Sequence, residues 1–220
     1  MFEPELDIIL PMEQMVEIIK KVKSVAGFKP LSDLACGRDA FGIIGKPEYL
    51  QENTKEEPFE NSISVRCAYE KIRYIAPNKV RKNLKILESW KIFTSKGNGA
   101  AGTLDLNLAN AIIGKAYVAE PNTACTDSLI PIGCFDNQIE AQNLAKYMAT
   151  KFLRFMVGIM KTSRNITQIV YKFVPVQDFT EASDIVWSKP IPEIDAQLYK
   201  KYNLSQEEID FIESMIKPME

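Results

Sequence analysis

The longest helical pattern in the sequence lies between Asp136 and Arg164. Apolar residues recur there three and four positions apart, so that at about 100° per residue they fall on one side of a helix. They are Ala141, Leu144, Ala145, Met148, Phe152, Phe155, Met156 and Ile159. Asp136 or Asn137 can cap the first amide groups of this segment. We therefore predict one long central helix whose apolar side faces a core.

Shorter patterns surround this helix. Helical periodicity predicts helices over residues 12–25, 193–202 and 205–216, the last opened by a capping box of Ser205 and Glu208. β-type runs separated by turn residues cover 63–69, 73–75, 91–95, 115–120, 128–135 and 171–178, with a short helix expected within 79–90. Residues 46–62 are polar and acidic and are expected to form a surface loop. The predicted fold class is α+β: a mixed or antiparallel β-sheet packed against a long central α-helix, with short helices at both ends.

A change of composition near the C-terminus suggests a domain boundary. Pro190 and Pro192 are followed by a stretch rich in acidic residues. We expect residues 1–180 to form the main domain, including the N-terminal helix, and residues 181–220 to form a helical tail packed on it.

Composition narrows the classes of function. The 220 residues are 46% hydrophobic, which fits a globular protein with a sizeable core. No apolar run approaches the length of a membrane span, and the N-terminus is acidic, unlike a signal peptide, so a cytoplasmic protein with no membrane contact is expected. The four cysteines are widely spaced and suggest reduced thiols rather than a zinc site. The sequence has no histidine, which excludes the commonest general base and the usual serine and cysteine catalytic arrangements.

Positive charge is concentrated in two segments, although the net charge is −2. From Lys71 to Thr103 there are eight basic residues and one acidic residue, Glu88. Between Lys146 and Lys172 there is no acidic residue at all. Such segregation can produce a strong local field on a mildly acidic protein. We expect the central helix to carry a basic edge that faces either phosphate groups or solvent.

Motifs for catalysis are missing. No Asp or Glu is followed by Lys at the second position, as in the common metal-dependent nucleases, and no NPPY-type methyltransferase loop occurs. The glycine-rich stretch at 96–103 is neither a P-loop nor a dinucleotide fingerprint, and is expected to be a mobile turn or a phosphate-approaching one. Asp105 and Glu120 are the acids that a magnesium-dependent hydrolase would have to use, but the sequence gives no reason to prefer them.

Four segments together resemble a known family. They are KIFTSKGNGAAGT, YVAEPNTACTDSLIPIG, AQNLAKYMATKFLRFMVGIMKT with NITQIVYKFVPVQDF, and LYKKYNLSQEEIDFIESMIKPM. In this order they are similar to the C-terminal part of bacterial restriction-modification enzymes, in particular the adenine-specific type IIG enzymes. The resemblance covers roughly residues 28–220.

The resemblance implies a target recognition domain that reads double-stranded DNA and is itself non-catalytic. The parent enzyme would be a restriction endonuclease and site-specific adenine DNA methyltransferase, whose methyltransferase and nuclease domains lie upstream. S-adenosylmethionine and magnesium are expected in those domains and no cofactor in this chain. The alternative is a protein-interaction domain that assembles the subunits or domains of such an enzyme.

Candidate DNA-binding residues come from three sources. The family segments suggest Lys96, Asn98, Thr126, Thr150, Lys151 and Arg154, with residues 150–154 open to the alternative of a packing pattern. Amide and guanidinium groups suited to base edges, and cations suited to phosphates, add Arg81, Lys82, Lys161, Arg164 and Asn165. Arg38 follows Gly37 in an irregular stretch and is a further exposed candidate.

Overall fold

The computed structural model describes residues 2–3, 8–9, 13–97, 112–161 and 165–219. Its α-helices are α1 (Glu13–Ser24), α2 (Pro47–Asn53), α3 (Leu84–Leu87), α4 (Gln138–Ala149), α5 (Lys151–Met160), α6 (Ile191–Lys201) and α7 (Gln206–Met215). Its strands are β1 (Phe2–Glu3), β2 (Ile8–Ile9), β3 (Thr54–Lys55), β4 (Ile63–Arg66), β5 (Ile72–Ile75), β6 (Trp90–Ser95), β7 (Tyr117–Ala119), β8 (Thr123–Cys125) and β9 (Leu129–Phe135). The predicted α+β class is confirmed.

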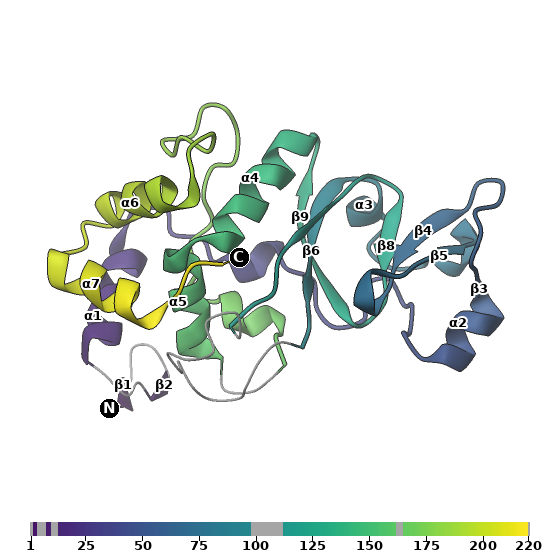
Figure 1. The fold of residues 1–220 in the computed structure, drawn as a ribbon, viewed down its shortest axis with the longest axis horizontal. Helices are drawn as coiled ribbons and strands as arrows, with labels where there is room; N and C mark the ends of the chain where they lie inside the picture. The colour runs from purple at the N-terminus through teal and green to yellow at the C-terminus, as the bar shows by residue number, and fades with distance from the viewer. Residues whose placement is uncertain (1, 4–7, 10–12, 98–111, 162–164, 220) are drawn as a thin grey trace.

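Two sheets lie between the helices (Figure 1). The order β7-β6-β9 makes an antiparallel sheet near the middle of the molecule. The order β3-β5-β4-β8 makes a mixed sheet at one end, in which β4 and β8 run parallel and the other pairs are antiparallel. Helices α1, α5, α6 and α7 gather at the other end. β1 and β2 pair with each other as a short antiparallel ribbon.

Strand β6 separates two hydrophobic cores. Side chains alternate between the two faces of a strand, and accordingly Ile92 belongs to the larger core while Phe93 belongs to the smaller one. The larger core contains the apolar sides of α1, α4, α5, α6 and α7, and the smaller one lies under the mixed sheet. Both Ile92 and Phe93 are fully buried, so β6 has no solvent-facing side at this point.

Lys91 is fully buried on β6, although it belongs to the basic segment of the sequence. Its ammonium group donates hydrogen bonds to the carbonyl oxygens of Leu87 at 2.9 Å, Ser89 at 3.0 Å and Glu120 at 2.8 Å. Burial lowers the pKa of Lys91 to about 8. This cation therefore joins the turn after α3 to the end of β7 and is not exposed for contact with a ligand.

The expected single central helix is wrong, because the chain breaks at Thr150 into α4 and α5. Thr150 has extended backbone angles, and its hydroxyl accepts the amide hydrogen of Leu153 at 3.1 Å, as an N-cap does. The two amides between Thr150 and Leu153, those of Lys151 and Phe152, donate to the two carboxylate oxygens of Asp195 on α6, at 3.0 and 2.9 Å. A carboxylate is favourable at this positive end of a helix. At the start of α4, Asn137 caps as predicted, accepting from the amide of Glu140.

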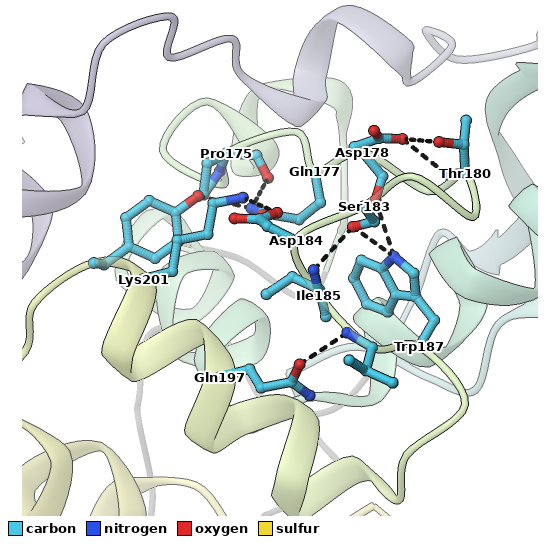
Figure 2. A network of polar contacts seen from close by, with 12 residues as sticks. Pro175, Gln177, Asp178, Thr180, Ser183, Asp184, Ile185, Trp187, Gln197 and Lys201 are labelled. Atoms are coloured by element: carbon cyan, nitrogen blue, oxygen red, sulfur yellow. Dashed lines mark hydrogen bonds and ion pairs between the residues drawn. The ribbon is translucent and has the colours of Figure 1, made fainter.

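The two C-terminal helices belong to the larger core. The predicted capping box of α7 is confirmed, since Ser205 and Glu208 exchange hydrogen bonds at 3.3 and 2.7 Å. The chain leading to α6 is fixed by polar contacts shown in Figure 2. Within them, Asp184 pairs with Lys201 at 2.8 Å and the amide of Val186 donates to Gln197 at 2.8 Å. The domain boundary expected after residue 180 falls within this network and remains a prediction.

Other segments differ from expectation. Residues 171–178 do not form a strand: Gln168–Tyr171 is a 3-10 helix, and the stretch makes an isolated β-bridge from Pro175 to Pro30. Helix α2 lies within the expected loop at 46–62, with Pro47 at its first turn, where proline is favourable. Within the described ranges no helix has the length and apolar character needed to cross a membrane.

The buried carboxylate of Asp195 gives a prediction for Asp195→Asn. Burial raises the pKa of Asp195 from 3.8 to about 6. A raised pKa means that the folded state binds the proton more tightly, so this stabilisation is complete below about pH 4 and is lost as the pH rises through about 6. Over that window wild type should lose up to about 3 kcal/mol of unfolding free energy that the variant does not lose. At pH 4 the variant should also be less stable by about 1 to 3 kcal/mol, because one helix amide loses its acceptor, and this deficit should shrink or reverse as the pH rises to 7.

Urea unfolding at pH 4, 5, 6 and 7 measures both effects. Glu193→Gln is the matched control, since it changes an exposed acid on the same helix. If the unfolding free energies of wild type and Asp195→Asn changed in parallel with pH, Asp195 would not have a raised pKa in the folded state.

Candidate functional site

A cavity of about 450 Å³ lies where the two sheets meet. Three segments line it: residues 66–70 between β4 and β5, residues 95–97 at the end of β6, and residues 127–129 leading into β9. Tyr117 at the start of β7 and Asn165 complete the lining. The site therefore lies where β6 leaves the two cores and polar side chains can reach solvent.

Arg66 occupies one wall of the cavity. It ends β4, where it pairs in parallel register with Cys125 of β8. Its guanidinium lies over the ring of Tyr117, 4.6 Å from the centroid, an attractive cation–π arrangement that also fixes the plane of the group. Among the described residues it makes no side-chain hydrogen bond or ion pair, so its N–H donors are available to a ligand. The same side chain lines a second cavity of about 290 Å³.

Lys96 and Asn165 bring a cation and an amide to the cavity. The amide of Lys96 donates to the carbonyl of Ser128 at 2.9 Å, and the carbonyl of Lys96 accepts from the amide of Ile166 at 2.6 Å. Gly97 and Asn165 form a β-bridge, which holds the two segments together. Both predicted DNA-binding residues thus line the same cavity as Arg66. Neither residue is fully buried.

The tip of the β4–β5 hairpin is strained. The amide of Lys71 donates to the carbonyl of Ala68 at 3.4 Å, closing a tight turn. Its two central residues, Tyr69 and Glu70, both have left-handed backbone angles, with φ of 55° and 60°. Two positive φ angles define a type I′ turn, which favours Asn-Gly. For other residues the left-handed region costs about 1 to 2 kcal/mol each.

Tyr69 is 94% exposed at this tip, on the rim of the cavity. The neighbouring acid, Glu70, is held in place because its carboxylate accepts a hydrogen bond from the hydroxyl of Tyr117 at 3.0 Å. This hydrogen bond raises the pKa of Tyr117. A second acid, Asp127, accepts the amide hydrogen of Gly45 at 2.8 Å. The cavity therefore combines hydrogen-bond donors, acceptors and an exposed aromatic ring.

The expectation of a solvent-facing basic edge on the central helix is wrong. Arg154 is fully buried, with its guanidinium donating to the carbonyls of Thr150 at 3.3 Å and Lys217 at 2.6 Å. Lys161 is 8% exposed, and burial lowers its pKa. Lys151 forms an ion pair with Glu213 of α7. Arg154 and Lys151 thus contact the C-terminal segment instead of facing solvent.

The other predicted site residues do not line the cavity. Arg38, Arg81 and Lys82 are exposed elsewhere, Lys82 in an ion pair with Asp39 at 2.9 Å. Thr126 is buried, and its amide donates to the carbonyl of Arg66, which places it beneath the site as a packing residue. Asn98 and Arg164 lie outside the described residues, as does Asp105.

Three residues of the cavity were not predicted from the sequence: Arg66, Tyr69 and Tyr117. Residues 63–69 were expected to be one strand, which would have placed Tyr69 within a sheet. The nearest sequence signal is the polar pair Glu70-Lys71 between two β-type runs, which is typical of a hairpin turn. No spacing in the sequence relates Arg66 to Tyr117.

Two further features bear on chemistry. Within the described ranges no group of three or more His, Cys, Asp or Glu side chains is arranged to hold a metal ion. A separate cavity of about 550 Å³ lies between α1 and α7. Acidic side chains dominate its lining: Glu13, Glu17, Glu207, Glu208 and Asp210.

Of three comparisons with known proteins, two found no match and one found a similar solved structure. No protein-family model matches the sequence. No curated protein matches it either. Among solved structures, the type IIG restriction endonuclease BpuSI is similar to this chain, with a TM-score of 0.46 and 10% sequence identity. The similarity covers 93% of this chain and 32% of the BpuSI chain, so this chain spans about a third of the length of the structure that it matches.

The hydrogen bond from Tyr117 to Glu70 gives a testable prediction. Because the carboxylate stabilises the neutral phenol, Tyr117 should titrate above its ordinary pKa of 10.0, and Glu70→Gln should bring it back towards that value. Titration of ring-¹³C-labelled tyrosine followed by NMR measures this, with Tyr117→Phe identifying the signal. A Tyr117 titration that is the same in wild type and Glu70→Gln would show that the two side chains are not joined in solution.

Proposed function

We propose that this chain is a non-catalytic, sequence-specific recognition domain for double-stranded DNA, belonging to a restriction-modification enzyme. The observation that carries the proposal is the cavity at the meeting point of the two sheets. There Arg66 presents a guanidinium without a hydrogen-bonding partner among the described residues, beside Lys96, Asn165 and the exposed ring of Tyr69.

The chemistry of these groups suits base and phosphate recognition. An arginine reads guanine and an asparagine reads adenine by paired hydrogen bonds, each worth about 1 to 3 kcal/mol of discrimination. Carboxylates such as those of Glu70 and Asp127 accept hydrogen bonds from the amino group of cytosine. A lysine such as Lys96 neutralises phosphate and supplies affinity that is independent of sequence. The cavity thus has groups for both positioning and reading DNA.

Sequence resemblance supports the same assignment. The four segments similar to type IIG restriction-modification enzymes include the stretch around Lys96 and the stretch leading to Asn165, the two predicted residues that line the cavity. By this reading the methyltransferase and nuclease domains, with S-adenosylmethionine and magnesium, are partners in the parent enzyme, which would act in the cytoplasm.

A second candidate function is the assembly of such an enzyme through protein contacts. The acidic cavity between α1 and α7 favours it, since its carboxylates would suit a basic partner surface. DNA is negatively charged and would bind a surface with cations, whereas a basic protein segment would bind a surface with carboxylates. Removal of cations at the Arg66 cavity should weaken DNA binding, whereas charge changes at the acidic cavity should not.

Variants of Lys96 and Arg66 test the DNA-binding proposal. Lys96→Ala should weaken binding to all duplexes alike and reduce the slope of log affinity against log salt by about one unit, as expected for one lost phosphate contact. Arg66→Ala should cost about 1 to 3 kcal/mol and relax the base preference at one position of the bound sequence. Lys200→Ala is the matched control: it removes an exposed cation from α6, outside the cavity.

Binding to a pool of randomised duplexes at two salt concentrations, followed by sequencing of the retained DNA, measures affinity and preference together. We expect one short motif to be enriched by wild type and by Lys200→Ala. Equal loss of affinity in all three variants would mean that net charge alone drives binding. If wild type retained no DNA at low salt, the proposed DNA-binding function would be wrong.

A further inference from the structure

We infer that Tyr69 stacks on a DNA base, so that the tip of the β4–β5 hairpin is a wedge that enters the base stack while the cavity beside it contacts the groove. This inference rests on the proposed function. It adds a second mode of recognition. Insertion of the aromatic ring depends on how easily two stacked base pairs separate, and not on the hydrogen-bonding groups at the edges of the bases.

The exposure of Tyr69 is the first observation. The residue is 94% exposed, whereas Ile169, the next most exposed large hydrophobic residue in the described ranges, is 55% exposed. Ile72, on the same hairpin, is 49% exposed. Ile72 begins the strand next to the tip, so an aromatic side chain at the tip is flanked by an aliphatic one, and proteins insert apolar residues of this kind between base pairs.

The backbone beneath Tyr69 is the second observation. The type I′ turn at Tyr69 and Glu70 would be more stable with Asn and Gly, the residues that accept left-handed angles readily. Strain held in this way at an exposed position is typical of functional sites. The turn is also held on both sides: Cys67 and Lys71 are joined by a hydrogen bond of 2.8 Å, and Glu70 is bonded to Tyr117. The ring is therefore presented on a fixed base, which lowers the entropy lost on stacking.

The surrounding charge favours a nucleic acid as the occupant. Arg66 and Lys96 line the same cavity as Tyr69, and Lys71, next to the tip, is exposed. Nucleic-acid-binding proteins combine aromatic rings, which stack on bases, with nearby cations, which contact the phosphate groups. The second cavity, on the other side of Arg66, is lined by Ile72 and Trp90, so apolar surface continues past the tip.

The test compares Tyr69→Asn with Tyr69→Phe in the full 220-residue chain. Asn suits the left-handed turn, so Tyr69→Asn should unfold at the same temperature as wild type or a higher one. Because it lacks a ring, it should bind the duplex selected by wild type about tenfold more weakly. Tyr69→Phe keeps the ring and should bind within about twofold of wild type.

A duplex carrying 2-aminopurine at successive positions supplies the second readout. Wild type and Tyr69→Phe should raise its fluorescence at one step of the site, where the stack opens, and Tyr69→Asn should not. Equal DNA binding by wild type and Tyr69→Asn would overturn the stacking role and leave the proposed function standing. Absence of duplex binding by wild type would overturn both.

Discussion

The structure depends on one constraint: strand β6 is buried on both faces. Ile92 packs into the larger core and Phe93 into the smaller one, so the same short segment holds the helical end and the mixed sheet together. A strand in this position has no face for polar side chains. Lys91 is tolerated because three carbonyl groups surround its ammonium. Ligand-binding groups are thereby confined to the end of the strand, where residues 95–97 reach the cavity.

Local signals predicted much of the fold. The ends of α1 and α7 followed from periodicity and from the Ser205–Glu208 capping box, because these contacts lie within a few residues of one another. The break between α4 and α5 could not be predicted in this way. Thr150 offers a cap, but the carboxylate of Asp195, which accepts the next two amides, lies more than forty residues further along the chain. The apolar run at 171–178 is buried without pairing as a strand, since burial alone does not determine how the backbone hydrogen-bonds.

The site was predicted less well than the fold. Lys96 and Asn165 were predicted as DNA-binding residues from their residue types and from the family segments. Nothing in the sequence indicated that the two would lie in the same cavity. Arg154 shows the opposite outcome. It was expected on a basic edge of the helix, yet it is fully buried and donates to the carbonyl of Lys217, more than sixty residues further along the chain. Arg66 and Tyr69 become neighbours of Tyr117 only because the mixed sheet, which contains β4, meets the antiparallel sheet, which contains β7. Such proximity is a property of the topology and leaves no spacing in the sequence.

The parallel pairing of β4 with β8 has a consequence for the order of folding. Ser64 lies opposite Thr123, so the mixed sheet is completed by a strand that follows about sixty residues later. Strands β6 and β7 lie within that interval and belong to the other sheet. Closing so long a loop is entropically costly until its ends are brought near each other by other contacts. The β4–β5 hairpin can therefore pair locally without β8, whereas the wall that carries Arg66 is complete only after β8 has joined it.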